Sequence, residues 1–175
     1  NAVYVGAGRT GILVDAGVSC ARVVSEMKAT GIDPAALSAI LITHEHSDHV
    51  AGAGILSRKF DLPIYATEGT WNAMAEKLGA VSAKNMRVIE SGQDFYIGDL
   101  DISPFPLPHD AADPCGYAFT CGRLRAAIAT DIGCLREGWL KAVSGCELVL
   151  LESNYDPGML KAGRYPYALK TRILG

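Results

Sequence analysis

Short apolar runs alternate with helical patterns along the first half of the chain, and Gly or Pro marks most of the joins. Runs of four to six apolar or β-branched residues predict strands. These strands are Ala2–Val5, Ile12–Val14, Ala39–Thr43 and Ile64–Thr67. Between the second and third strands, Val23, Val24 and Met27 share one face of a helix that should end at Gly31. The alternation predicts a sheet with helices packed on it.

Three further helix signals occur in this half. Asp33 and Pro34 are typical of an N-cap followed by Pro at the first helical position. A longer helix should run from about His49 to Phe60. Its residues available for burial are Val50, Ala53, Ile55, Leu56 and Phe60. A last stripe at helical spacing, which we interpret as core packing rather than a cofactor site, consists of Trp71, Met74, Ala75 and Leu78.

The middle of the chain changes to an alternation with period two, which is typical of antiparallel strands. The strands predicted there are Met86–Glu90, Asp94–Ile97, Asp101–Leu107, Tyr117–Cys121 and Ala126–Thr130. Turns at Gly98-Asp99 and Gly122-Arg123 should close two hairpins. An apolar strand, Glu147–Leu151, and a helix, Pro166–Leu174, follow. The whole pattern predicts one α/β domain over residues 1–175, with two mixed sheets between outer helices.

The segment from Gly6 to Gly11 matches the G-x-G-x-x-G string of dinucleotide-binding proteins. In those proteins the glycines open a helix whose N-terminus meets the pyrophosphate. Here the strand Ile12–Val14 follows instead, so we interpret the glycines as a hairpin turn between two strands.

Composition narrows the class of protein. With 175 residues, 49% hydrophobic and 20% charged, the chain can bury a sizeable core and is not a disordered protein. Its longest apolar runs are far short of the ~20 residues of a membrane span, so we expect no membrane partner. A net charge of −3 gives no general attraction for nucleic acid. Local cations or a metal would have to hold any polyanion.

The cysteines and the chain ends also carry information. Five cysteines at wide spacing, without a Cys-x-x-Cys pair, favour reduced thiols and a cytoplasmic protein. The sequence begins at Asn1 inside a strand-like run and stops at Gly175 just after a helical pattern. We therefore expect N-terminal and C-terminal elements to be missing.

Three of the four histidines lie within six residues, directly after a predicted strand. That strand should deliver His44 and His46 to one side of its carboxyl end, where ligands gather in α/β sheets. Ser47 and Asp48 can then begin a helix that returns Asp48 and His49 to the same place. Side chains this close would repel one another once protonated unless a cation held them. The motif therefore predicts a metal centre.

Two more candidate ligands follow apolar runs in the same way. His109 comes after Ile102–Leu107 and Asp131 after Ala126–Thr130, so every histidine in the sequence belongs to the predicted centre. Histidine and carboxylate ligands without a thiolate favour zinc, with manganese or iron as alternatives. More than four ligands argues for two divalent ions. Such a pair can share a bridging water and present hydroxide as the nucleophile at neutral pH.

This pattern resembles the metallo-β-lactamase superfamily over nearly the whole chain. The residues that carry the resemblance are Ile12-Leu13-Val14, Asp15-Ala16-Gly17, His44-x-His46-x-Asp48-His49, His109 and Asp131. Softer matches at residues 1–17, 43–52, 108–111 and 151–156 resemble the WalJ (YycJ)-type branch of nuclease-like hydrolases. The resemblance implies an αββα sandwich of two mixed sheets with outer helices, truncated here at both ends.

The resemblance also implies roles for single residues. The metal ligands would be His44, His46 and His109 for the first ion, Asp48 and His49 for the second, and Asp131 as the bridge. Asp48 and Asp131 would also be the catalytic residues. Asp15 would orient the histidine loop, unless it only caps a turn, and Glu152 could hold a histidine or a metal-bound water. The superfamily supplies a further histidine near the C-terminus, and none follows His109 here, so the second ion should bind weakly or not at all.

Three functions remain open at this point. The first is a metal-dependent hydrolase that uses a metal-bound hydroxide to cleave phosphodiester bonds of nucleic acid, in the manner of an exonuclease. The second is a hydrolase of a small thioester, lactone or cyclic diester. The third is a metal-binding regulatory module without turnover. Antibiotic-hydrolysing members with two zinc ions commonly have a cysteine where Asp131 stands, which argues against lactam hydrolysis.

Groups that could hold a nucleic-acid strand are few. The candidate cations are Arg58, Lys59, Lys161, Arg164, Lys170 and Arg172, and a solvated surface is the simpler role for them. Tyr155, Tyr165 and Tyr167 could stack on bases or could serve in packing. The oligomeric state is left open.

Overall fold

The first sheet has five strands in the order β1-β2-β3-β4-β5. The structure is a computed structural model, and it describes residues 1–134, 137–152 and 156–174. The strands are β1 (Val3–Ala7), β2 (Thr10–Val14), β3 (Leu37–Leu41), β4 (Ile64–Thr67) and β5 (Met86–Ile89). β1 and β2 are antiparallel, and the other neighbours are parallel. The β1–β2 hairpin turns at Gly8, which has a φ of 56°. The interpretation of the glycine string as a hairpin turn is therefore confirmed.

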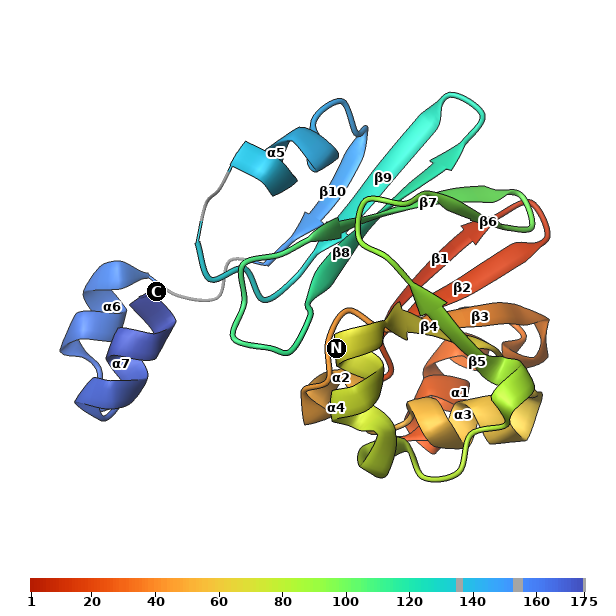
Figure 1. Ribbon diagram of the computed structural model, residues 1–175, viewed down its shortest axis with the longest axis horizontal. Helices are drawn as coiled ribbons and strands as arrows, with labels where there is room; N and C mark the ends of the chain where they lie inside the picture. Colours follow the sequence, from red (N-terminus) through yellow and green to blue (C-terminus); the bar gives the residue numbers. More distant parts are fainter. Residues whose placement is uncertain (135–136, 153–155, 175) are drawn as a thin grey trace.

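Helices cover the outer face of this sheet (Figure 1). They are α1 (Cys20–Ala29), α3 (Ala53–Phe60) and α4 (Glu68–Leu78). Leu13 and Ile40 of the sheet pack in one buried cluster with Val23 of α1, Leu56 of α3 and Met74 of α4. Burying these apolar side chains is the main force that holds the helices on the sheet.

The second sheet also has five strands in the described part of the chain, in the order β10-β9-β8-β7-β6. They are β6 (Phe95–Ile97), β7 (Leu100–Pro106), β8 (Cys115–Cys121), β9 (Leu124–Ala129) and β10 (Leu148–Leu151). β10 runs parallel to β9, and the other pairs are antiparallel. Helix α5 (Glu137–Val143) packs on the outside through the buried ring of Trp139.

The two sheets pack face to face. Ile12 and Leu41 of the first sheet share a buried cluster with Ile102 and Tyr117 of the second. The Tyr117 hydroxyl also donates a 2.7 Å hydrogen bond across the interface to the carbonyl of Ile42. Two mixed sheets with helices outside confirm the predicted αββα sandwich.

The structure corrects three local predictions. The helix expected from His49 to Phe60 is divided into α2 (Ser47–Val50) and α3, because Gly52 turns back toward the β2 loop and donates from its N–H to the Ala16 carbonyl. Ile55, which was expected to be buried, is 51% exposed. After Asp33 the chain makes only a 3₁₀ turn, Pro34–Ala36, with the predicted Asp33 cap in place.

The C-terminal part differs from the rest of the chain. Helices α6 (Pro157–Ala162) and α7 (Tyr167–Leu174) form a pair that stands apart from the two sheets (Figure 1). The predictions for residues 153–155, Tyr155 included, and for the side chain of Arg172 lie outside the described residues. A further 3₁₀ turn, Ala83–Asn85, precedes β5. Within the described residues, every helix is too short or too polar to cross a membrane.

Candidate metal centre

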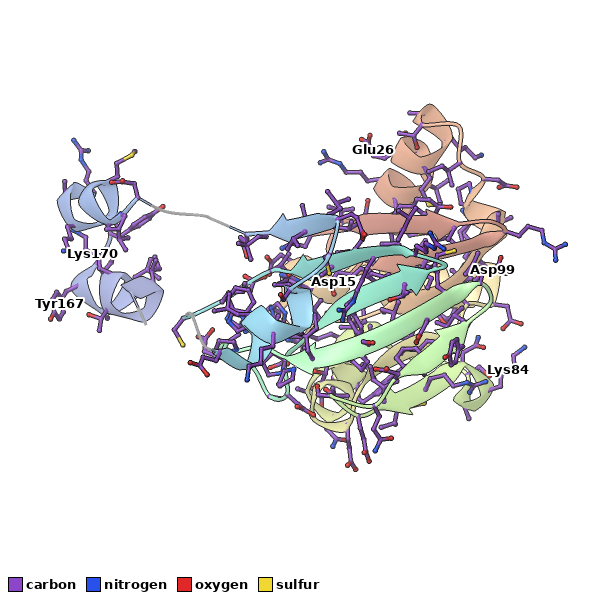
Figure 2. The ribbon with its side chains drawn as sticks, turned by 90° about the horizontal axis from the view of Figure 1, so that it is seen from above. Asp15, Glu26, Lys84, Asp99, Tyr167 and Lys170 are labelled. Carbon is purple, nitrogen blue, oxygen red and sulfur yellow. The ribbon has the colours of Figure 1, made fainter. Side chains whose placement is uncertain are left out.

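Three loops and the short helix α2 (Ser47–Val50) bring the predicted ligands together at one end of the sandwich. His44 and His46 follow β3, His49 lies on α2, His109 follows β7 and Asp131 follows β9. The ligands therefore come from both sheets. Asp15, which follows β2 and is labelled in Figure 2, is buried beside His49.

Three imidazoles converge in the first group. His44 Nε2 lies 3.1 Å from His46 Nδ1, and His109 Nε2 lies 3.2 Å from the same nitrogen. A tetrahedral zinc ion with Zn–N bonds of about 2.0–2.1 Å spaces its nitrogens by about 3.3 Å. Two nitrogens at such a distance can share only one proton between them, whereas a cation accepts a lone pair from each. The geometry of these three histidines therefore fits a divalent metal.

His44 also belongs to a second group, with His49 and Asp131. Oδ2 of Asp131 lies 2.9 Å from Nε2 of His49. This buried oxygen has no further polar partner among the described residues. Asp131 also has a φ of 55°, a left-handed conformation that asparagine and aspartate adopt more readily than other side-chain-bearing residues. A buried carboxylate oxygen that faces an imidazole nitrogen at this distance suits a metal ligand, because one ion can accept a lone pair from each.

Asp48 lies at the edge of this second group. Its side chain is 71% exposed, and Oδ2 is 3.6 Å from Nε2 of His49. The side-chain amide of Asn1 contacts both residues, at 3.4 Å from Asp48 Oδ2 and 2.8 Å from His49 Nε2. Asp48 is therefore near the centre but is absent from the two convergent groups found among the described residues.

Asp15 contacts His49 directly and His44 through Thr43, on the side of each ring that faces away from the centre. Its Oδ1 accepts a 2.8 Å hydrogen bond from the Thr43 N–H, and its Oδ2 accepts one of 2.8 Å from the Thr43 hydroxyl. The same Oδ2 lies 2.8 Å from His49 Nδ1, and the Thr43 oxygen lies 3.0 Å from His44 Nδ1. Because carboxylate and hydroxyl occupy the Nδ1 sides, both rings turn Nε2 toward the centre. Such a partner fixes the tautomer and orientation of a ligand histidine.

Burial and charge set the protonation of the group. Burial and the nearby rings of His49 and His109 lower the pKa of His44 to about 3, and burial also lowers the pKa of His109. Burial would lower the pKa of His49 too, but contacts with Asp131 and Asp15 raise it to about 9. For Asp131, contact with His49 outweighs burial and holds the carboxyl pKa below its ordinary value. His44 and His109 are thus neutral at pH 7, which is the form that binds a metal.

A family model described as a beta-lactamase superfamily domain matches residues 10–164. The chain belongs to the metallo-β-lactamase superfamily. This result confirms the resemblance inferred from the histidine motif. It leaves open which of the superfamily's reactions the chain performs, because one fold can carry several chemistries.

Curated relatives in the superfamily include two named exodeoxyribonucleases. The chain is 40% identical over 174 residues to exodeoxyribonuclease YycJ of Bacillus anthracis, a match that covers 99% of this chain and 66% of the relative. It is 38% identical over 176 residues to exodeoxyribonuclease WalJ of Streptococcus pneumoniae, covering 99% of this chain and 65% of the relative. The chain thus spans about two thirds of the length of these relatives.

A solved structure shares the fold. Zn(2+)-bound PqqB from Methylobacterium extorquens superimposes with a TM-score of 0.78 at 20% sequence identity. The match covers 94% of this chain and 64% of that one. At this identity, the likeness establishes the common architecture alone.

The loop Asp15-Ala16-Gly17, which follows β2, is joined by backbone hydrogen bonds to the segment from His44 to Gly52. The Ala16 N–H donates a 2.7 Å hydrogen bond to the His49 carbonyl, and the Gly52 N–H donates one of 2.7 Å to the Ala16 carbonyl. A Cβ at Gly17 would lie 1.4 Å from the carbonyl oxygen of Asp48. Only glycine permits this approach, so the two loops hold each other in place.

The structure gives Glu152 a defined hydrogen-bond partner, which the sequence did not indicate. Its Oε2 accepts a hydrogen bond from the backbone N–H of Asp131, directly after β10. This contact connects Glu152 to the candidate centre through the backbone of a predicted ligand residue. It supports the left-handed conformation of Asp131.

The sequence did not single out Glu45, which lies between two histidines of the motif. Its Oε1 accepts a 2.9 Å hydrogen bond from the N–H of Ala112, three residues after His109. Lys77 of α4 donates a 2.8 Å hydrogen bond to the Glu45 carbonyl. Glu45 thereby joins the histidine loop to the loop that carries His109. Its position inside the motif was a signal, but its partner became visible only in three dimensions.

Replacing Glu45 should weaken the three-histidine group. We expect Glu45→Ala to lower metal affinity by about 10- to 100-fold, the range found when an outer partner of a metal ligand is lost. Glu45→Gln keeps an acceptor oxygen for Ala112 and should bind within a few fold of the unaltered protein. Titration against a competing chelator measures both affinities. Glu76→Ala, an exposed glutamate of α4, is the control. Equal affinity in Glu45→Ala and the control would contradict this role.

Proposed function

We propose that this chain is the hydrolytic domain of a metal-dependent phosphodiesterase that acts on nucleic acid, in the manner of an exonuclease. One observation carries the proposal: two convergent ligand groups share His44, and Asp131 supplies a carboxylate to one of them. The named activity of the two exodeoxyribonuclease relatives agrees with this chemistry. A cysteine at position 131 would have favoured the lactamase alternative.

The residues divide into holding and orienting roles. His44, His46 and His109 would hold one divalent ion, and His49 with Asp131 and Asp48 would contribute to a second. Zinc is the first choice, with manganese or iron as alternatives. When bound, such ions supply Lewis acidity toward a phosphoryl group and lower the pKa of a coordinated water.

The protein groups around the ions would then orient the ligand side chains and accept a proton. Asp15 keeps Nε2 of His44 and His49 facing the centre, and Glu152 fixes the backbone of Asp131. The side chain of Asp48 is 71% exposed at the rim, where its carboxylate can accept a proton from a water beside the substrate. These are the roles we assign to the predicted site residues.

We also propose a cytoplasmic location. The five cysteines are all thiols in the structure, without a disulfide among them. Reduced thiols are the rule in that compartment.

Substrate profiling tests the proposed function. Purified protein should contain divalent metal, and it should hydrolyse 5′-phosphorylated DNA and bis(p-nitrophenyl) phosphate. Chelation should abolish both activities, and one of zinc, manganese or iron should restore them. A thioester, a lactone, a cyclic diester and a lactam complete the panel. Turnover of one of these without the phosphodiesters would assign the centre to small-molecule hydrolysis. Bound metal without any turnover would indicate a regulatory module.

A further inference from the structure

The α6–α7 pair concentrates positive charge in an acidic protein. Residues 157–174 include four basic residues and no acidic residue. They are Lys161, Arg164, Lys170 and Arg172. The chain as a whole carries a net charge of −3, so the remainder is more acidic still. Within this one short segment, basic residues thus stand without any acidic residue.

A side-chain hydrogen bond joins the two helices of the pair. Lys170 of α7 donates a 2.7 Å hydrogen bond from Nζ to the backbone carbonyl of Lys161 on α6. This contact places the ammonium group of Lys170 beside the backbone of Lys161, which carries an ammonium group of its own. The side chains of Lys161 and Arg164 are exposed, and α6 begins at an Asp156 cap. Exposed cations on one small pair of helices, without acidic residues beside them in the sequence, favour an anionic partner.

Exposed aromatic rings lie next to these cations. Tyr165 is 58% exposed and Tyr167 is 85% exposed, in the connection and at the start of α7. Figure 2 shows Tyr167 at the end of the pair that is remote from the two sheets. Cations interleaved with exposed rings are the combination that binds single-stranded nucleic acid, because phosphates meet the cations and bases stack on the rings.

The pair is also attached close to the metal centre. Glu152 contacts the backbone of Asp131, and α6 begins at Pro157, five residues later. A fully extended chain spans at most about 3.6 Å per residue, so α6 begins within about 18 Å of Glu152. A strand held by the pair would therefore lie within reach of the centre.

We propose that the α6–α7 pair binds single-stranded nucleic acid and presents it to the metal centre. Lys161, Arg164 and Lys170 contact phosphates, and Tyr165 and Tyr167 stack on bases. This inference rests on the proposed function, to which it adds the surface that holds the strand.

The test removes two exposed charges and measures strand binding apart from chemistry. The variant is Lys161→Gln with Arg164→Gln, and the matched control is Lys28→Gln with Arg123→Gln, two exposed cations on α1 and in the β8–β9 turn. The probe is a fluorescein-labelled single strand with phosphorothioate linkages, which resist cleavage. Fluorescence anisotropy gives Kd over a range of salt concentrations, and thermal melting checks the fold of each variant.

The expected result is specific to the pair. The first variant should bind the strand at least about tenfold more weakly, and its slope of log K against log salt should fall by about 1.4, or 0.7 for each lost phosphate contact. Its KM for 5′-phosphorylated single-stranded DNA should rise, while hydrolysis of bis(p-nitrophenyl) phosphate stays unchanged. Tyr167→Leu should weaken binding by about fivefold or more without changing the salt slope. The control should match the unaltered protein.

The outcomes separate the two proposals. Unchanged Kd and salt slope in the Lys161→Gln, Arg164→Gln variant would overturn the inference, even if the protein is a nuclease. Loss of binding to phosphatidylglycerol vesicles, with DNA binding intact, would also overturn it and assign the pair to a lipid surface. Failure of the unaltered protein to cleave any phosphodiester would instead contradict the proposed function, and the anisotropy measurement would still decide the role of the pair.

Discussion

Asp131→Ala is expected to lose both stoichiometric metal and hydrolysis while both sheets stay folded. The substitution removes a carboxylate that contacts His49 and shares a ligand group with His44. Loss of an outer partner of a ligand costs up to about 100-fold in activity, and loss of the ligand itself should exceed that figure. The fold should survive because the side chain lies in a loop after β9, outside the apolar clusters.

Metal analysis and an activity assay check this prediction together. Asp131→Asn preserves the shape of the side chain and should show a partial loss of metal. Asp94→Ala, an exposed aspartate in the loop before β6, should behave as the unaltered protein does. Full metal occupancy in Asp131→Ala would disprove the ligand role.

Among the glycines that the structure describes, Gly17 should be the one at which an added methyl group is most damaging, in the variant Gly17→Ala. The new Cβ would meet the carbonyl oxygen of Asp48 at 1.4 Å, and the obstacle is backbone, which cannot rotate away. The two loops must separate, so the hydrogen bond from Ala16 to the His49 carbonyl is lost with the contact. We expect the free energy of unfolding to fall by about 3 kcal/mol or more, the upper end for overpacking. Metal affinity should fall as well, because His49 moves.

Urea denaturation of the metal-free protein measures the first effect, and chelator competition measures the second. Gly138→Ala is the matched control, because a Cβ there meets nothing within 4 Å. That change lies in α5 and should be neutral or stabilising, since Ala favours helix over Gly by about 1 kcal/mol. Similar stability in Gly17→Ala and the control would show that the loops are not held as tightly as their contact implies.

The pattern of apolar positions predicted most of this fold, because the residues that a strand or helix buries must be apolar. β2 and β3 are buried along nearly their whole length, so their apolar runs were visible in the sequence. The division between α2 and α3 was not visible, because it depends on Gly52 contacting a loop more than thirty residues earlier. Helix α5 was not predicted either, since its seven residues bury mainly the single ring of Trp139.

For the candidate site too, local sequence patterns predicted the residues, whereas contacts between distant segments could not be predicted. The histidines and Asp131 could be predicted because each follows an apolar strand, and strand ends meet at the edge of a sheet. The place of Glu45 could not, because it depends on the position of Ala112 after folding. Glu152 was noticed from its place after a strand, but its contact with the Asp131 backbone required the parallel pairing of β10 with β9.

The origin of the ligands in both sheets has a consequence for stability. His44, His46 and His49 belong to the first sheet and its loops, whereas His109 and Asp131 belong to the second. An ion held by both sets ties the two halves of the sandwich together, and the unfolded chain offers no such site. By mass action, free metal at 1,000 times its Kd stabilises the native state by about 4 kcal/mol. The cell's supply of metal would therefore help to set the lifetime of the folded protein as well as its activity.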